Sequence, residues 1–292
     1  MYELIRVTPT CGYVESPAKV GVIALPDGGA ALIDSGSDKD AAKKLRRHLE
    51  ANGWPLRMIL CTHSHADHIG GNRYLQELTG CRIFAPGIEC AFTNHPLLEP
   101  AYLYGGNPPA ELRGKFLMAK PSCAEPLTDA SLPAGVEAIP LPGHSFAMTG
   151  FRVDRRVVFL ADCLASARTL EKYQVSFLVD VQAYLDTLER VRSMEAECFI
   201  PAHAEATGDI APLAQMNIAK VHEIGDTVVA LLSEPCCFEM LLQRLFAHFS
   251  LTMTFEQYAL VGSTLRAYLT WLRENGRIEA FFENGLLCWR AV

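Results

Sequence analysis

The sequence predicts a mixed α/β fold that is followed by a helical module ending in a β-hairpin. In the first two thirds of the chain, short apolar runs alternate with amphipathic segments, and several of these runs end in histidine or aspartate. The last third is dominated by helical patterns and finishes with two apolar runs joined at Asn284-Gly285, a strong hairpin signal. With 292 residues, of which 50% are hydrophobic and 20% charged, the chain can bury a substantial core.

The first third is predicted to contain strands followed by a helix. The expected strands span residues 2–7, 18–25 and 30–34. A lysine-rich amphipathic helix is expected over residues 40–52, and Gly53 marks its end. Asp34 ends the third strand, where we expect it either to orient a histidine of a neighbouring loop or to cap the following helix.

The segment THSHADHIGG, which follows an apolar run, contains the most informative pattern. It places four metal-capable side chains within six consecutive residues, namely His63, His65, Asp67 and His68. Burying such groups without a partner is costly, and imidazole nitrogens and carboxylate oxygens are suitable ligands for zinc and similar ions. In extended backbone the first two histidines share a face, and the other two side chains approach from a turn toward a helix expected near Gly71. This geometry favours two adjacent metal ions over one.

Three later apolar runs each end in a further metal-capable residue. Residues 136–144 end in Gly-His, residues 156–162 end in Asp, and residues 197–203 end in His. We therefore expect His144, Asp162 and His203 to lie at the tips of three strands, at one edge of a sheet, where functional loops collect.

The pattern H-x-H-x-D-H followed by Gly-Gly resembles the signature of the metallo-β-lactamase-fold hydrolases, a group that includes glyoxalase II. The later His, Asp and His residues occur in the order found in that family. The resemblance implies an αββα sandwich over residues 1–210. Three expected helices followed by a β-hairpin over residues 211–292 resemble a winged helix, a module that several metallo-β-lactamase-fold hydrolases carry after the catalytic domain. The family resemblance also implies that one ion is held by His63, His65 and His144, the other by Asp67, His68 and His203, and that Asp162 bridges them.

The expected cofactor is a pair of divalent ions, first of all Zn²⁺, with iron or manganese as alternatives. Two such ions lower the pKa of a bound water from 15.7 toward about 7, which gives hydroxide at neutral pH. The expected activity is hydrolysis of an ester-, thioester- or lactone-like small molecule, with Asp67 and Asp162 as catalytic residues. No G-x-S-x-G motif supplies a serine nucleophile, and Ser64 and Ser145 are interpreted as positioning residues in the metal loops.

Two alternative activities remain open at this stage. One is a phosphodiesterase or endoribonuclease of the lactamase-like group, which the predicted winged helix supports. The other is a mononuclear iron persulfide dioxygenase, whose ligands overlap with those found here. The flavodiiron proteins of the same fold are disfavoured, because they resemble H-x-E-x-D at the first motif and this chain has His65 in place of the Glu.

Two segments are candidate contacts for the substrate. After Asp162, the residues Arg168, Lys172 and Tyr173 suit an anionic substrate, and the last two loosely resemble the glutathione-contacting stretch of glyoxalase II. The irregular, proline-rich segment 86–133 is expected to form a lid or wall over the site. Its candidate substrate contacts are Tyr102, Tyr104 and Lys115. His95 lies outside every ligand position of the family and is interpreted first as a surface residue and second as a substrate contact.

The C-terminal third is expected to contain three helices before the hairpin. Their expected spans are residues 210–232, 236–249 and 261–275, with a capping-type sequence at Thr254. From Gln215 onward the chain has six Lys and Arg residues against eight Asp and Glu residues, which disfavours nucleic-acid binding. We interpret this module as a packing or homodimerisation element that also lines one side of the active site.

The cysteine content and the N-terminal sequence predict a cytoplasmic protein. Ten cysteines are scattered without a C-x-x-C pair, as expected for reduced thiols, and Cys61 and Cys163 are expected to point into the core. The sequence shows neither a signal-peptide pattern nor an apolar stretch long enough to span a membrane. The formal net charge of −7 is consistent with a small-molecule substrate and not with nucleic acid.

Overall fold

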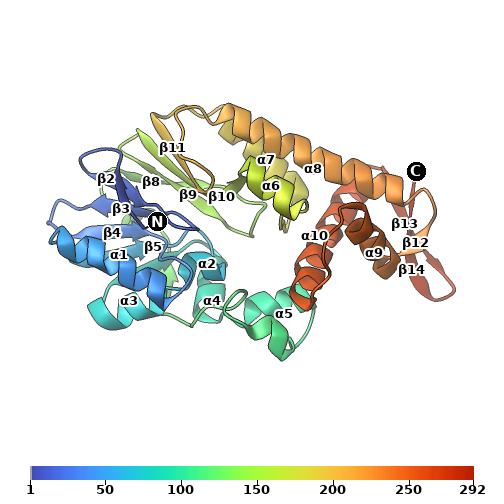
Figure 1. The fold of residues 1–292 in the computed structure, drawn as a ribbon, viewed down its shortest axis with the longest axis horizontal. Helices are drawn as coiled ribbons and strands as arrows, with labels where there is room; N and C mark the ends of the chain where they lie inside the picture. Colours follow the sequence, from blue (N-terminus) through green and yellow to red (C-terminus); the bar gives the residue numbers. More distant parts are fainter. Residues whose placement is uncertain (1) are drawn as a thin grey trace.

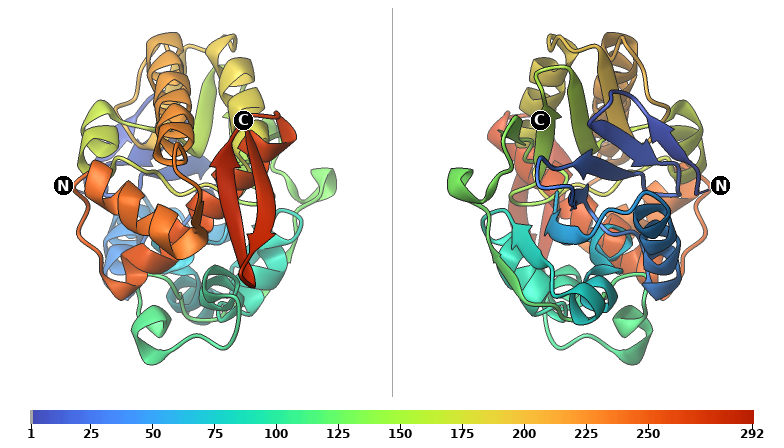
Figure 2. Two further views of the ribbon diagram at one scale, coloured as in Figure 1. Left: turned by 90° about the vertical axis from the view of Figure 1, so that its right-hand side faces the viewer. Right: turned by 90° about the vertical axis from the view of Figure 1, so that its left-hand side faces the viewer.

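Two β-sheets face each other across an apolar core, and helices cover their outer faces (Figures 1 and 2). The structure, a computed structural model, describes residues 2–292. The predicted mixed α/β architecture is therefore confirmed. Among the described residues, no helix combines the length and the apolar composition needed to cross a membrane.

The first sheet contains seven strands in sequence order, antiparallel from β1 to β4 and parallel from β4 to β7. Its strands are β1 (Leu4–Arg6), β2 (Cys11–Val14), β3 (Val20–Ala24), β4 (Ala30–Ile33), β5 (Leu56–Leu60), β6 (Arg82–Ala85) and β7 (Ala124–Pro126). Strands β2 and β4 are buried along their whole length, because this sheet has the second sheet on one face and helices on the other. The sequence analysis did not anticipate β2.

Helices α1 (Lys39–Ala51) and α3 (Asn72–Thr79) pack on the outer face of this sheet. Helix α1 begins at Asp38, whose carboxylate accepts hydrogen bonds from the backbone of Asp40 and Ala41, so Asp34 is not its cap. The short helix α2 (Ala66–Ile69) contains Asp67 and His68, which were expected in a turn before the helix.

The second sheet has the strand order β11-β10-β9-β8. Its strands are β8 (Val136–Pro140), β9 (Thr149–Val153), β10 (Val157–Ala165) and β11 (Cys198–His203). Phe151, Phe159 and Ile200 face the first sheet and form the core between the two layers with residues such as Ile33 and Phe84. The outer face packs against α7 (Val181–Arg192) and α8 (Ala211–Leu231), and α6 (Ala167–Tyr173) follows β10.

Segment 86–133 is more ordered than its proline-rich sequence suggested. Besides β7 it contains α4 (Glu89–Asn94), α5 (Leu98–Tyr104), η1 (Ala110–Arg113) and η2 (Asp129–Ser131). Leu103 and Leu112 are buried in a small cluster with Ala259 of the C-terminal region, and this packing compensates for the weak local signals.

The C-terminal region follows from α8, which extends from the second sheet to the far end of the molecule (Figure 1). Its remaining elements are β12 (Cys236–Cys237), α9 (Phe238–His248), α10 (Phe255–Glu274), β13 (Ile278–Glu283) and β14 (Leu286–Ala291), with the sheet order β12-β14-β13. Helix α10 begins six residues before the expected position of residue 261, since the side chain of Thr254 caps it by accepting a hydrogen bond from Gln257 N at 3.2 Å. Residues 236–237 form a strand and not the start of a helix. The winged-helix assignment and the boundary at residue 211 stay predictions.

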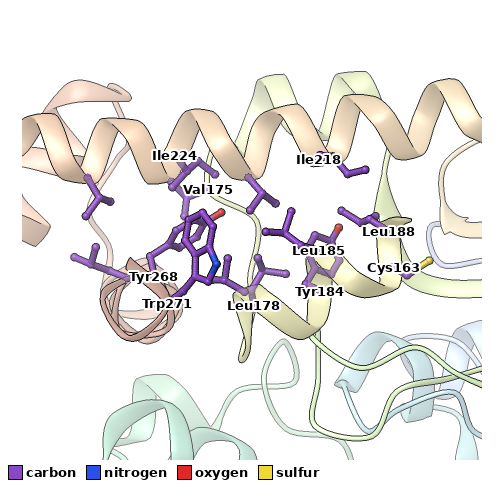
Figure 3. Close-up of a cluster of buried hydrophobic side chains, with 14 of the residues drawn as sticks. Cys163, Val175, Leu178, Tyr184, Leu185, Leu188, Ile218, Ile224, Tyr268 and Trp271 are labelled. Atoms are coloured by element: carbon purple, nitrogen blue, oxygen red, sulfur yellow. The ribbon is translucent and has the colours of Figure 1, made fainter. Parts of the chain in front are cut away.

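One continuous core joins this region to the second sheet. Figure 3 shows Tyr268 and Trp271 of α10 beside Val175, Leu178 and Ile224, and the same buried cluster extends to Cys163 in β10. The indole nitrogen of Trp271 also donates a hydrogen bond of 3.0 Å to the Gln182 side chain in α7. Helix α10 is therefore held at a fixed position relative to the strands that carry the candidate site.

Candidate metal centre

All seven metal-capable residues singled out in the sequence come together as two adjacent groups. The ligand-capable atoms within each group lie within 4.8 Å of one another. The first group is His63, His65 and His144, and the second is Asp67, His68, Asp162 and His203. Residues more than 130 positions apart thus meet at one edge of the two sheets, as their position at or near strand ends predicted.

The three nitrogens of the first group face a common point. The Nε2 atoms of His63 and His144 each lie 3.0 Å from Nδ1 of His65. Four ligands that surround a zinc ion tetrahedrally at about 2.0–2.1 Å are about 3.3 Å apart. The spacing of these nitrogens therefore fits a single ion between them.

In the second group, Asp162 lies between the two clusters. Its Oδ1 atom is 2.9 Å from His68 Nε2, and its Oδ2 atom is 3.2 Å from His203 Nε2 and 3.6 Å from His144 Nε2. Within residues 2–292, His68 Nε2 and Asp162 Oδ1 are buried without a partner in hydrogen-bonding geometry, although they are close together. Buried polar atoms are rarely left without a partner, and a divalent cation would satisfy both. The donor set thus fits a metal ion.

The two groups differ in their electrostatics. Burial lowers the pKa values of His65 and His144 to about 4. Burial is also the main reason why the pKa of His63 lies well below its usual range. These imidazoles are neutral at pH 7 and can donate lone pairs to a cation. In contrast, Asp162 raises the pKa of His203 to about 10, and the carboxylates around His68 outweigh its burial and raise its pKa well above the usual value. The second group is therefore a cluster of ion pairs when no metal is bound.

The carboxylate of Asp67 belongs to this ion-paired cluster. Its burial acts to raise the pKa, but the neighbouring His68 and His203 lower it more strongly, to about 2. Asp67 Oδ2 lies 3.2 Å from His203 Nε2. The group is thus ionised at neutral pH and available as an oxygen ligand.

Asp34 orients His68 from behind. Its Oδ2 atom lies 2.7 Å from His68 Nδ1, and because a carboxylate only accepts, Nδ1 carries the proton and Nε2 faces the site. The same carboxylate accepts hydrogen bonds of 2.8 Å from the backbone and the hydroxyl of Thr62. Since the Thr62 hydroxyl donates to Asp34, it accepts from Nδ1 of His63 at 3.0 Å. One buried aspartate therefore fixes a histidine of each group, which matches the first of the two roles predicted for it.

Backbone carbonyls orient two further histidines in the same way. The Nδ1 atom of His144 donates to the carbonyl of Phe177 at 3.0 Å, and that of His203 donates to the carbonyl of Pro17 at 2.8 Å. In both residues Nε2 is left to face the site. Such outer partners set the tautomer and the ring orientation of metal-binding histidines.

The carboxylate of Glu89, which the sequence analysis did not single out, connects the two loops of the first group. Glu89 is 1% exposed and begins helix α4. Its Oε2 atom accepts from the backbone and the hydroxyl of Ser64, and its Oε1 atom accepts from the hydroxyl of Ser145 and the backbone of Ala147. Ser64 and Ser145 therefore position the loops, as the sequence suggested, although the acceptor they share could not be read from a single sequence.

The expected strand tips need correction at two positions. His203 is the last residue of β11, but His144 lies four residues beyond the end of β8. Asp162 lies inside β10, where the pairing with β11 shifts register and Ala161 has a φ of 49°. This irregularity turns the aspartate toward the site before the strand ends. Cys61 and Cys163 are fully buried, as expected.

A cavity of about 870 Å³ opens beside Asp67, His144, Asp162 and His203. Arg168, Lys172 and Tyr173 line it, and Lys172 donates a hydrogen bond of 3.0 Å to the Tyr173 hydroxyl. The four candidates from segment 86–133 do not line it: Lys115 pairs with Asp38, and Phe116 is the residue of that segment that reaches the cavity. Contact of Tyr102, Tyr104 and Lys115 with a substrate therefore stays a prediction that this cavity does not support. His95 is exposed, in agreement with its first interpretation as a surface residue.

The family model described as the metallo-beta-lactamase superfamily matches residues 14–203. A metallo-beta-lactamase family protein from Thermus thermophilus has a similar structure, with a TM-score of 0.75 and 19% identity over 98% of this chain and 100% of that chain. A beta-lactamase domain protein from Burkholderia ambifaria gives a TM-score of 0.71 and 16% identity over 99% and 94% of the respective chains. At these identities the likeness concerns the fold alone.

Similarity to curated proteins is confined to short segments. A hydroxyacylglutathione hydrolase from Bradyrhizobium sp. (strain ORS 278) is 49% identical over 49 residues, which is 17% of this chain and 19% of that protein. A protein of the same name from Pseudomonas entomophila (strain L48) is 41% identical over 59 residues, or 20% of this chain and 22% of that protein. The match thus spans about a fifth of the length of these relatives.

Proposed function

Since the chain belongs to the metallo-beta-lactamase superfamily, we propose that this hydrolase uses two divalent ions to cleave an ester-, thioester- or lactone-like small molecule. The observation that carries the proposal is the position of Asp162 between two groups of inward-facing ligand atoms. A thioester is the first choice among the substrates, because the short curated matches are to hydroxyacylglutathione hydrolases.

In this proposal each group of side chains holds one ion. His63, His65 and His144 bind the first ion, and Asp67, His68 and His203 bind the second. Asp162 would serve both ions, since its carboxylate lies near His68 and His203 of the second group and near His144 of the first. Zn²⁺ is the expected metal, because five imidazoles and two carboxylates form a nitrogen-rich donor set.

The bound ions would supply a water of lowered pKa and an electrophilic partner for the bond to be cleaved. The protein prepares this centre before any substrate arrives: Asp34 and two backbone carbonyls orient histidine rings, and Glu89 fixes the two loops that carry the first group. Lys172 and Tyr173, which line the cavity, are assigned to substrate binding.

The C-terminal region has a supporting role in the proposal. We retain the division into a catalytic domain, residues 1–210, and a winged-helix-like domain, residues 211–292, whose helix α10 lines the substrate cavity. Its acidic composition supports a small molecule and not a nucleic acid as the substrate.

The test combines metal analysis with a substrate panel. Protein purified without added metal is analysed for its metal content and assayed with a thioester, a lactone, a chromogenic β-lactam, a bis-aryl phosphodiester and a short RNA. About two zinc ions per chain with thioester or ester turnover is the expected result. About one iron per chain without hydrolysis would favour the sulfur-oxidising alternative, and cleavage of the phosphodiester or the RNA alone would favour the endoribonuclease alternative.

A further inference from the structure

The cavity beside the candidate metal centre has an apolar end that helix α10 closes. Leu164, Val175 and Tyr184 line it from the side of the second sheet, and Leu260 and Val261 line it from α10. Leu164, Tyr184 and Val261 are each at most 4% exposed, so this end lies below the protein surface. An apolar group that enters it would be removed from water almost completely.

The exposed part of the cavity lining carries positive charge. Arg168 and Lys172 line it, and the carboxylates that line it, Asp67 and Asp162, belong to the metal centre. Within residues 2–292, the Arg168 guanidinium forms neither an ion pair nor a hydrogen bond with another side chain. A cation beside a catalytic centre and without a protein partner is well placed to bind an anionic group of a ligand.

Arg168 also marks the junction with a second groove of about 990 Å³. Arg168, Thr169 and His203 line both hollows, and the groove continues past Lys19 along the surface. A ligand that is cleaved near His203 can therefore extend in two directions, into the buried apolar part of the cavity or into the open groove. The groove is also lined by Glu15, Glu205 and Asp209, and Lys19 pairs with Glu15, so an anionic group is favoured at Arg168 and not farther along the groove. A large polar portion fits only the open direction.

We propose that the substrate joins an apolar acyl group to an anionic leaving portion, and that α10 determines the size of the acyl group. This inference rests on the proposed hydrolase function and narrows it to acyl thioesters or esters of an anionic carrier. The acyl group occupies the end below Leu260 and Val261, and the anionic portion lies against Arg168. A cavity of about 870 Å³ is within the usual range for small-molecule sites of several hundred Å³ and is far larger than an acetyl group requires.

The C-terminal region thereby acquires a specific role in substrate selection. Helix α10 is held in place by the core cluster that contains Val261, Leu265 and Tyr268, and Trp271 bonds to Gln182 of α7. The cavity wall that Leu260 and Val261 form therefore belongs to a packed helix. Each methylene buried there would raise kcat/KM about fourfold, until the apolar end is filled.

The experiment measures acyl-chain preference with the full-length, metal-loaded protein. Acetyl, hexanoyl and decanoyl thioesters of coenzyme A are compared with the same thioesters of uncharged N-acetylcysteamine. The variant Leu260→Trp should lower the ratio of decanoyl to acetyl kcat/KM at least tenfold, and Leu260→Ala should shift the preference toward longer chains. The control Thr270→Tyr alters an exposed position on α10 outside the cavity and should leave the ratio unchanged.

Charge recognition is measured with Arg168→Gln, which should raise KM about tenfold for the coenzyme A thioesters but not for those of N-acetylcysteamine. The inference is overturned if Leu260→Trp, folded as judged by its circular dichroism, keeps the wild-type chain-length ratio. Calorimetric binding of a non-hydrolysable decyl thioether of coenzyme A gives a reading that does not depend on turnover. If the wild-type protein hydrolyses no thioester or ester, the proposed function fails. The cavity assignment is then judged by binding of the thioether alone. Tenfold weaker binding by Leu260→Trp than by the wild-type protein would support the assignment, and equal binding by the two proteins would overturn it.

Discussion

Glu89 accepts hydrogen bonds of 3.0 Å from the backbone and 2.5 Å from the hydroxyl of Ser64, at the centre of the H-S-H sequence. In extended backbone the side chain of Ser64 points to the opposite side from those of His63 and His65. Its hydrogen bond to Glu89 therefore fixes the loop without occupying the candidate metal site. The other oxygen of Glu89 holds Ser145 at 2.8 Å, next to His144. A single buried carboxylate thus sets the distance between the two loops that carry the first group.

We predict that Glu89→Gln weakens metal binding at the first group. The amide can accept with one oxygen only, so its NH₂ group must face two hydrogen-bond donors of one loop. Hydrogen bonds to charged groups contribute about 1.5–3 kcal/mol, and we expect at least about a tenfold loss of metal affinity in competition with a chromophoric chelator. Glu77→Gln, at an exposed glutamate that pairs with Arg73, is the matched control. Wild-type affinity in Glu89→Gln would show that the loops hold their positions without this carboxylate.

Asp34→Asn should affect the second group more than the fold. Asp34 has a φ of 65°, a conformation that asparagine tolerates better than alanine, so asparagine is the appropriate replacement. An amide oxygen in the place of Oδ2 keeps the bonds from the Thr62 hydroxyl and His68 but turns the NH₂ group against the Thr62 backbone N–H, and the reverse orientation turns the NH₂ group against His68 Nδ1. In either orientation one donor of this network faces another donor. Loss of such an outer partner reduces metal affinity about 10–100-fold. In a stepwise zinc titration, the dissociation constant of the weaker binding step should increase by this factor. An unchanged dissociation constant would mean that Asp34 has no effect on His68.

Removal of the bridging carboxylate should affect both ions together. Asp162→Ala leaves His68 and His203 without the oxygens that lie 2.9 and 3.2 Å away, and it opens the bridge to His144. We expect bound metal well below the wild-type content and no measurable turnover, as we also expect for His65→Ala. Elemental analysis and the substrate panel check this result, and full activity of either variant would contradict a dinuclear mechanism.

The sequence predicted the candidate site better than the elements around it. The H-x-H-x-D-H pattern identified four of the seven side chains. The other three were identified because each stands at the end of an apolar run, and metal-binding residues of such a fold lie at or near the ends of strands. Asp34 was located as well, since a buried strand-end aspartate needs a donor. Glu89 was missed, because its partners come from loops 25 and 56 residues away and nothing in its own neighbourhood marks it.

A local cap and tertiary packing explain the errors in the predicted elements. Helix α10 starts at Phe255 and not near Val261, because the Thr254 side chain caps it there. The segment around Leu103 and Leu112 folds against Ala259, a contact over more than 140 residues that local patterns do not reveal.

The two groups should respond differently to pH when metal is added. In the metal-free protein the pKa of His203 is raised to about 10 and that of His68 is also raised, so an ion that binds there must displace protons. Affinity at the second group should therefore increase between about pH 6 and 9, by up to about tenfold per pH unit for each proton released. The pKa values of His65 and His144 are lowered to about 4, so affinity at the first group should be nearly constant in this range. Titration calorimetry in buffers of different ionisation enthalpy counts the protons, and equal release at both steps would contradict this electrostatic asymmetry.

Gly143 gives a prediction about the loop that presents His144. Its φ is 121°, and a Cβ atom there would lie 2.4 Å from the backbone nitrogen and Cα of Tyr184 in helix α7. The strained dihedral and the clash should together make Gly143→Ala lower the free energy of unfolding by about 3 kcal/mol or more, and displacement of the loop should weaken metal binding at the first group. Gly53→Ala is the matched control, because Gly53 also has a positive φ, of 65°, but has open space around the added atom. It should lose about 1 kcal/mol in urea denaturation and keep wild-type metal affinity, since its loop lies at the end of α1. If both variants lost the same stability and bound metal equally, close packing of Gly143 against α7 would have no part in positioning His144.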